Sequence, residues 1–578
     1  MARRTKRRRT KRRAPDPKVL EQRAQKKSAR TLFRKCGFQR IGVEDIHFTF
    51  KNRTGELDDL FVFKNVLVIV EYTVTGDPSA HLLGKKVLFD QINGHPVDWI
   101  DEFRAICPEL SSHLDANPYS PAQYQVRIIY CTKNAPSEEA QAACKYVLLL
   151  GPREIRYFIA LTKTISLSSR AELYKFLKLD SRRIADRVLR AASDSKDFSG
   201  FLLPESFSSF PRGFRLASFY ADPETLLETC FVLRKDSWRD PESLYQRMLM
   251  PKKIRNMRRY LSDNSRVFIN NIIVSLPSEA VLLDPSDRSK VLTDALLHDI
   301  QPVTIQLPQK FNSVGVIDGQ HRIFCYHEGE DVYEEKVSPL RKKQHLLVTG
   351  VIYPASLPEE KRRKFEAQLF LEINDEQTKT RSDLKQSIAL LLRPTSTVAI
   401  CKAIVNRLAE KGPLKDLLEI HFFDDKNKLK TASIVSYGLK PLVKFEGTDT
   451  LFKLWKHEQK EGLRTSKKTN YPADALKSYI EFCASKISDL LLAAKLSIGP
   501  DNWKSQADGG LLSPTLVNGF IVCLRELVTH RKSTSGSFYA SSLKGLNTFP
   551  FKDYKSSHWR RLGLKIAETH FAIRHPPK

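Results

Sequence analysis

Alternating and helically spaced apolar positions predict an α/β region in the first third of the chain. The spacing predicts a helix over 20–33, ended at Gly37, and a strand over 41–50. Two apolar runs, 57–63 and 66–73, flank the pair Lys64-Asn65 and predict a β-hairpin. After the hairpin we expect a helix over 79–92, a strand over 125–132, a helix over 136–145 and a strand over 154–162.

The predicted hairpin brings two carboxylates together at one end of a buried strand. With a two-residue loop at Lys64-Asn65, counting outward places Asp58 opposite Glu71, whereas a three-residue loop would place Asp59 there. The sequence leaves this choice open. Paired carboxylates are hard oxygen ligands for Mg²⁺ or Mn²⁺, and such ions promote phosphodiester cleavage by activating water.

The string from Gly55 to Thr73 resembles the metal-binding hairpin of the PD-(D/E)XK nucleases, in which a G-E-x-D segment precedes a strand ending in E-x-K. The resemblance implies a restriction-endonuclease-like αβββαβ core. It also implies a catalytic, metal-binding role for Asp58 or Asp59 together with Glu71. Thr73 stands where the family has its lysine, so Lys85 or Lys86 on the next helix would have to supply that cation. A degenerate nuclease fold that only binds DNA is the alternative.

A second pattern lies in the middle of the chain, where an apolar run over 314–317 meets the pentapeptide Asp318-Gly319-Gln320-His321-Arg322 and a helix-compatible run over 323–327. This order predicts a strand, a tight turn and a helix start. Glycine allows close approach to the backbone, the first helical turn offers free amides, and Arg322 offers a fork of donors. The pattern is typical of a phosphate site.

The flanking segments predict a basic amphipathic helix over 252–261, with Arg258 on its solvent face, and strands over 267–275 and 346–353. Together with the later string from Phe370 to Lys379, the pentapeptide resembles the DGQHR-domain proteins, which are DndB-like and related to the ParB/sulfiredoxin fold. The resemblance implies that ATP, CTP or a DNA phosphate binds at the turn. The residues it implicates are Asp318, Gly319, Gln320, His321, Arg322, Asn374, Gln377 and Lys379.

Two of these residues keep simpler alternatives. His321 either acts as an acid or base or only hydrogen-bonds a neighbouring loop. Asp318 either holds a metal or a ribose hydroxyl or only caps the helix. From Leu384 onward the apolar spacing is helical, which predicts a mostly α-helical last third. The expected organisation is therefore a tail over 1–15, a nuclease-like domain over 16–180, a DGQHR domain over 181–395 and a helical region over 396–578.

Charge supports a polyanionic partner. The 578-residue chain has 95 Lys and Arg against 66 Asp and Glu, a formal net charge of +29, and nine of the cations lie in the first thirteen residues. The rest of the chain therefore keeps about +20, which favours DNA as the partner. The expected DNA contacts are Arg3, Arg4, Arg7, Arg8, Arg9, Arg12, Arg13, Arg247 and Arg258.

The cysteine spacing and the lengths of the apolar runs argue against a disulfide-rich, zinc-binding or membrane-spanning protein. The nine cysteines form neither a CxxC pair nor a zinc-spaced cluster, so we expect reduced, mostly core cysteines. No apolar run approaches the roughly 20 residues of a membrane span. We expect a cytoplasmic, nucleoid-associated protein of bacterial phage defence or DNA modification, with homo-oligomers left open.

The expected activity is Mg²⁺-dependent DNA cleavage coupled to a DNA- or nucleotide-sensing DGQHR domain. The alternatives are a non-catalytic DNA-binding regulator of a phosphorothioation-like modification locus and a nucleotide hydrolase centred on Arg322.

Overall fold

The structure is a computed structural model that describes residues 16–117, 119–189, 195–234, 237–239, 246–293, 296–377, 382–421, 424–465 and 471–574, with only the backbone described at 189, 375–377 and 383. The chain is a mixed α/β protein with several sheets, and it divides into two compact units. The described residues up to Val232 and those of Leu249–Ser356 form the first unit. Those of Leu233–Met248 and of Leu357–Lys578 form the second.

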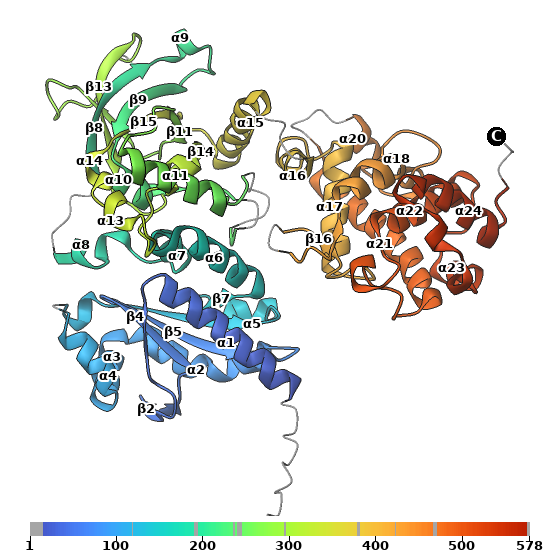
Figure 1. The fold of residues 1–578 in the computed structure, drawn as a ribbon, viewed down its shortest axis with the longest axis horizontal. Helices are drawn as coiled ribbons and strands as arrows, with labels where there is room; N and C mark the ends of the chain where they lie inside the picture. Colours follow the sequence, from blue (N-terminus) through green and yellow to red (C-terminus); the bar gives the residue numbers. More distant parts are fainter. Residues whose placement is uncertain are drawn as a thin grey trace, which may run out of the picture. The chain divides into compact units, whose positions relative to one another are not determined.

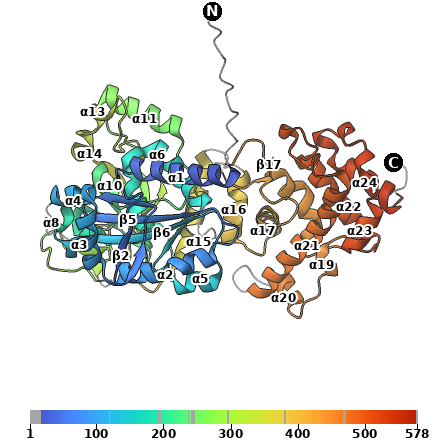
Figure 2. The ribbon, with the colours of Figure 1, turned by 90° about the horizontal axis from the view of Figure 1, so that it is seen from below.

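The first unit begins with a five-stranded mixed sheet. Its strands, in spatial order, are β1 (Gln39–Ile41), β4 (Asp59–Phe63), β5 (Val66–Thr73), β6 (Gln125–Thr132) and β7 (Leu148–Leu150). The first three run antiparallel, whereas β6 and β7 continue parallel to β5. Helix α1 (Pro17–Lys35) covers one face of the sheet, and α2 (Ser79–Gly94) with α5 (Glu138–Ala143) covers the other (Figures 1 and 2). All eight residues of β5 are buried between these layers, as expected for a central strand covered on both faces.

The expected hairpin register is confirmed. Phe63 pairs with Val66 across the Lys64-Asn65 turn, and the pairing continues outward to Asp59 and Val70. Lys64 adopts a φ of +53°, which lets the chain reverse within two residues. Because the loop has two residues, the next step of the register sets Asp58 against Glu71.

The strand expected over 41–50 is wrong. The chain leaves the sheet after β1 and forms a separate small hairpin of β2 (Phe48–Phe50) and β3 (Arg53–Gly55). The turn residues Lys51 and Asn52 have φ values of +45° and +65°, the conformation that a tight two-residue hairpin turn requires. Helices α3 (Pro96–Ile106) and α4 (Pro108–Asp115) then precede β6.

The strand expected over 154–162 is also wrong, because this segment lies in helix α6 (Pro152–Ile165). Pro152 occupies the first turn, and the Glu154 carboxylate accepts the Gly151 N–H at 3.1 Å, so the helix start is capped. Ile155, Phe158, Leu161 and other apolar residues of the helix are buried at helical spacing. The last strand of the sheet is the short β7 just before this helix.

A second sheet of eight strands completes the first unit. Its order is β10 (Cys230–Phe231), β14 (Val314–Asp318), β11 (Ile272–Ser275), β15 (Leu346–Ile352), β9 (Arg215–Ala221), β8 (Ser195–Leu203), β13 (Gln301–Pro308) and β12 (Val281–Leu283). The accompanying helices include α7 (Arg170–Phe176), α8 (Asp186–Leu189), α9 (Glu205–Ser208), α10 (Pro223–Thr229), α11 (Pro251–Asn264), α12 (Gln320–Phe324), α13 (Glu334–Val337) and α14 (Leu340–Lys343). The expected strand, turn and helix start at the pentapeptide are confirmed by β14 and α12.

The second unit is mostly helical, as the spacing predicts. Its main helices are α15 (Glu359–Gln377), α16 (Ser382–Leu392), α17 (Thr397–Glu410), α18 (Lys440–Val443), α19 (Leu451–Leu454), α20 (Lys460–Thr465), α21 (Ala473–Ile498), α22 (Pro514–Thr529), α23 (Gly536–Ser542) and α24 (Trp559–Phe571). A short parallel pair, β16 (Leu418–Glu419) and β17 (Leu429–Lys430), and a π-helix, η6 (Ile434–Leu439), interrupt them. One apolar core extends from α17 to α24.

All nine cysteines are free and buried, as expected. Among the described residues, no single helix combines the length and apolarity needed to cross a membrane. The helices Leu384–Leu392 and Thr397–Glu410 pass this test only as a pair, and they are bent by 109° at the break between them.

Candidate functional site

The carboxylates of Asp58 and Glu71 meet at the end of the β4–β5 hairpin. Glu71 lies near the end of β5 and is buried, whereas Asp58 immediately precedes β4 and is half-buried. The Asp58 Oδ2 atom accepts the backbone N–H of Tyr72 at 2.9 Å, which holds this carboxylate beside the strand. The hairpin register therefore builds the pair, with no long-range contact required.

Two lysines contact the carboxylate pair from opposite faces of the sheet. Lys85 of α2 places its Nζ atom 2.8 Å from Glu71 Oε1, and Lys26 of α1 places its Nζ atom 2.6 Å from Asp58 Oδ1. Lys86, the other candidate, instead forms an ion pair with Asp90 one turn later on α2. Of the two lysines expected to replace the one missing at Thr73, only Lys85 contacts a carboxylate of the pair.

Glu71 is electrostatically unusual. Its pKa is raised to about 7, first by burial and then by the neighbouring charge of Asp58, while Lys85 opposes both effects. The buried Oε2 atom has no hydrogen-bond partner within the part of the chain that the structure describes. A buried, unpaired carboxylate oxygen is costly, and a divalent cation would satisfy it together with the charge of Asp58.

The donor set fits Mg²⁺ or Mn²⁺. Mg²⁺ is commonly held by one or two carboxylates, with water and substrate phosphate completing its shell. Asp58 and Glu71 provide that number. The described residues contain no group of three or more His, Cys, Asp or Glu side chains placed to hold a metal ion.

Asp59 takes a different role from the one that a three-residue loop would give it. Its side chain is fully buried on the α1 face of the sheet, because neighbouring strand residues point to opposite faces. It accepts hydrogen bonds from Arg30 Nε at 2.8 Å, from the Tyr72 hydroxyl at 2.9 Å and from Arg40. The structure thus places Asp58 opposite Glu71 and pairs Asp59 with two arginines.

Three residues near the pair were not selected from the sequence. Gln25 of α1 donates to the carbonyls of Thr73 and Cys131, each at 3.2 Å, and thereby spans the ends of β5 and β6. Lys26 lies beside it. A contact between α1 and these strand ends has no local sequence signal.

His81 is the third, and it precedes Lys85 by one turn of α2, so helical spacing could have indicated it. Its Nδ1 atom lies 2.9 Å from the hydroxyl of Tyr130, which donates to the Pro78 carbonyl at 3.1 Å. Because the hydroxyl has one proton, His81 Nδ1 is the donor and Nε2 is left as an acceptor. Burial, and then the charge of Lys85, lower the pKa of His81, which favours this neutral form.

The DGQHR turn is closed by its own arginine. Gly319 has a φ of +95°, and a Cβ atom there would lie 3.1 Å from Arg322 Nη2. Arg322 Nη2 donates to Asp318 Oδ2 at 2.7 Å. The glycine therefore makes room for the guanidinium group of the same turn, and a phosphate would have to compete with Asp318 for Arg322. Helix α12 has only five residues, so it lacks the aligned peptides of a longer helix.

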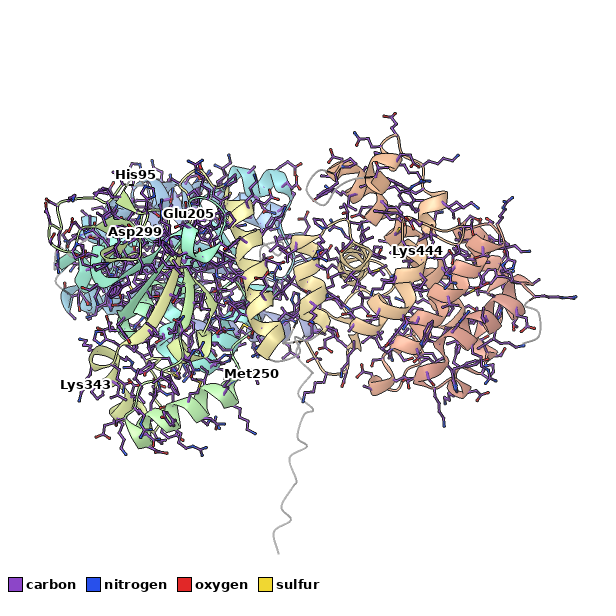
Figure 3. All side chains as sticks on the ribbon, turned by 90° about the horizontal axis from the view of Figure 1, so that it is seen from above. His95, Glu205, Met250, Asp299, Lys343 and Lys444 are labelled. Carbon is purple, nitrogen blue, oxygen red and sulfur yellow. The ribbon has the colours of Figure 1, made fainter. Side chains whose placement is uncertain are left out.

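His321 braces the loop before α11. Its Nε2 atom accepts the backbone N–H of Met250 at 3.1 Å, and Figure 3 labels Met250 at the start of that helix. His321 is buried, and an Nε2 acceptor requires the proton to be on Nδ1. This is the geometry of the simpler alternative, in which His321 hydrogen-bonds a neighbouring loop.

Arg258 is corrected from a DNA contact to a buried structural residue. It is fully buried on the same face of α11 as Ile254 and Leu261, because positions 254, 258 and 261 share one side of a helix. Its guanidinium binds Asp331 at 2.8 Å, Glu334 at 2.9 Å and the carbonyls of Cys325 and His327. The spacing of these positions indicates the buried face, but the charge of Arg258 favoured the solvent face in the sequence-based prediction.

The remaining predicted contacts are only partly described. Arg247 is exposed, and the Asn374 side chain donates to the Phe370 carbonyl one turn earlier in α15. Gln377 ends α15, but its side chain lies outside the described residues, as does Lys379. Arg3, Arg4, Arg7, Arg8, Arg9, Arg12 and Arg13 also lie outside them.

Comparison with known proteins finds no matching family model, no matching curated protein and no matching solved structure.

Proposed function

We propose that the chain is a metal-dependent deoxyribonuclease with a PD-(D/E)XK-like core, coupled to a DGQHR domain that senses DNA or a nucleotide. The observation that supports this most is Glu71, a buried strand carboxylate with one oxygen unpaired and the other 2.8 Å from Lys85. Asp58 opposes it in register. Two carboxylates and a cation at a strand end are the groups that phosphodiester hydrolysis uses.

The topology supports the same proposal. The order of α1, three antiparallel strands, α2 and the parallel strand β6 is the order that the resemblance to PD-(D/E)XK nucleases implies. The net charge of +29 adds a long-range attraction to DNA.

Each residue has a distinct proposed role. Asp58 and Glu71 would hold Mg²⁺, which supplies Lewis acidity and lowers the pKa of bound water. Lys85, whose Nζ atom contacts Glu71 at 2.8 Å, would donate to a phosphate oxygen as negative charge develops there. His81, with Nε2 free to accept, takes a proton from the attacking water or from a relaying solvent molecule.

Lys26 neutralises Asp58 from the α1 side when no metal is bound. Gln25 ties α1 to the ends of β5 and β6, so that Lys26 is held above the pair. Thr73 contributes no charge, so Lys85 carries the role that the family assigns to the E-x-K lysine. In the second sheet, a DNA or nucleotide phosphate would displace Asp318 from Arg322 and thereby change the turn that His321 anchors to α11.

The test is cleavage of supercoiled and linear DNA in Mg²⁺ or Mn²⁺ by the wild type, by Glu71→Gln and by Glu56→Gln. Glu56 is an exposed acid two residues before Asp58, so its change controls for lost charge near the hairpin. We expect metal-dependent cleavage by the wild type and by Glu56→Gln, with loss in Glu71→Gln. DNA binding by all three without any product would contradict the nuclease and favour the non-catalytic DNA-binding regulator.

A further inference from the structure

An exposed aromatic stack occurs on the second unit. Tyr437, in the π-helix η6, stacks on Trp559 at the start of α24, with ring centroids 5.9 Å apart and planes 20° apart. Tyr437 is 55% exposed, so its contact with Trp559 leaves more than half of this residue open to solvent. π-Helices are rare and are frequently found at functional sites.

Three glycines bring these distant segments together on α22. A Cβ atom at Gly438 would lie 2.4 Å from Asn518 Oδ1, so a larger residue there would force the Asn518 side chain of α22 to move. Gly519 of α22 and Gly563 of α24 make the corresponding close contact between those two helices, which lie side by side in Figures 1 and 2. The Thr515 hydroxyl, near the start of α22, donates to the Ser556 carbonyl just before α24. The aromatic stack is thus held on a rigid base.

Four exposed cations flank Trp559 in the sequence: Lys552, Lys555, Arg560 and Arg561. Within the described part of the chain none of them forms an ion pair, although Arg561 lies over the ring of Tyr554 at 5.9 Å. Asp553 is the only acid from Phe549 to Lys565. The segment from Phe549 to Lys565 therefore has an excess of exposed positive charge, with aromatic residues between its cations in the sequence.

Helix stability does not explain why Arg560 and Arg561 occupy their positions. They lie in the first turn of α24, which contains no acid, and cations there oppose the positive end of the helix dipole. Residues that cost stability and form no ion pair are expected where a ligand compensates them. An anion with stackable rings matches both the cations and the exposed tyrosine face.

We propose that Tyr437, Trp559, Lys552, Lys555, Arg560 and Arg561, called here the Tyr437 surface, bind single-stranded DNA. An unpaired base stacks on the open face of Tyr437 and extends the two-ring stack, while the cations contact the neighbouring phosphates. The choice of DNA rests on the proposed function, because a deoxyribonuclease acts on DNA. A single strand is favoured over a duplex because paired bases do not offer their faces to a tyrosine.

The test is binding of fluorescein-labelled oligo(dT) by fluorescence anisotropy, in EDTA, with every variant made in the full-length Glu71→Gln chain. Tyr437→Ala should weaken binding about tenfold or more, and Tyr437→Phe should bind like the parent because stacking needs only the ring. Arg560→Gln/Arg561→Gln should lower the slope of log Kd against log salt by about 1.4, since each phosphate that a cation neutralises contributes about 0.7 to the slope for a single strand.

Arg531→Gln/Lys532→Gln is the matched charge control. These exposed cations follow the far end of α22, about 24 Å along the helix from its start at the usual rise per residue, and they should affect the slope less. Equal binding by Tyr437→Ala and Tyr437→Phe, or equal slope changes in the two double variants, would overturn the proposal. Loss of oligo(U) binding without loss of oligo(dT) binding would assign the surface to RNA instead.

The anisotropy measurement of oligo(dT) binding does not depend on DNA cleavage. If the wild type cuts no DNA but the Tyr437 surface variants behave as expected, the nuclease fails and the binding surface stands. If cleavage is observed but these variants bind oligo(dT) like the parent, the nuclease stands and the surface fails.

Discussion

At the scale of single residues, environment assigns roles that residue type and position leave open. Asp58 and Asp59 are adjacent and chemically identical, yet one faces Glu71 and the other binds two arginines, because strand residues alternate between faces. Lys85 and Lys86 are likewise neighbours on α2, but their side chains bind different carboxylates. In each case the sequence offered both neighbours as candidates, and only the strand register and the helix rotation select the member that lies beside Glu71.

Glu71 predicts a specific pH dependence of stability. Its folded pKa of about 7 is above its ordinary value of 4.5, so the folded state binds more protons between these values. Stability is therefore lost as pH rises through this window, by on the order of 3 kcal/mol at 1.36 kcal/mol per pKa unit. Glu71→Gln has no titrating carboxyl at this position. In EDTA, its free energy of unfolding relative to that of the wild type should therefore rise from pH 5 to pH 8.

Urea denaturation at pH 5, 6, 7 and 8 measures this difference. The exposed Glu56→Gln change is the control and should show no such trend. A difference between Glu71→Gln and the wild type that stays constant with pH would mean that Glu71 is not held at a raised pKa.

At the scale of elements, local signals succeeded where one segment determines its own structure. The two-residue hairpin, β6 at residues 125–132 and the β14-to-α12 turn follow from apolar spacing and turn residues. The errors occurred where spacing is ambiguous over few residues. The apolar spacing of segment 154–162 also fits a strand, although Pro152 and the Glu154 cap start a helix there. The acceptors that stabilise the buried Arg258 follow 67 to 76 positions later in the chain, so its pairing has no local signal.

The DGQHR turn predicts a difference between two glycine substitutions. Gly319 and Gly545 both have positive φ values, +95° and +80°, but a Cβ atom at Gly545 meets nothing within 4 Å. Gly545→Ala should therefore cost only the backbone strain, about 1 kcal/mol, whereas Gly319→Ala should cost about 1 to 3 kcal/mol and displace Arg322. Denaturant unfolding of both variants measures the difference, and equal costs would show that Arg322 does not pack on Gly319.

At the scale of the whole molecule, the sequence established charge but not which distant segments meet. Tyr437 and Trp559 are far apart in the chain and meet through glycine contacts with α22. Lys26 reaches Asp58 from a helix on the other side of the hairpin. Such contacts leave no periodic pattern in the sequence. The sequence therefore indicated the part of the candidate site on the hairpin and α2, but not the contacts made by α1.

Net charge predicts how DNA binding responds to salt. Deleting residues 1–13 removes nine cations but leaves about +20 on the remaining chain. The deletion should reduce the slope of log Kd against log salt without abolishing it, because each duplex phosphate contact contributes about 0.9. Anisotropy titrations of duplex DNA between about 50 and 200 mM salt measure the slope. A slope that falls to zero would confine all phosphate contacts to the tail.

The central claim is that Asp58, Glu71 and Lys85 form one catalytic group, and the most direct measurement is the single-turnover rate of Mg²⁺-dependent DNA cleavage by Lys85→Ala beside Lys86→Ala. The two changes remove the same charge from adjacent positions of one helix, but only Lys85 contacts Glu71. We expect Lys85→Ala to lose about 100-fold or more in rate and Lys86→Ala to stay close to the wild type. Equal rates in the two variants, or no cleavage by the wild type, would contradict the account.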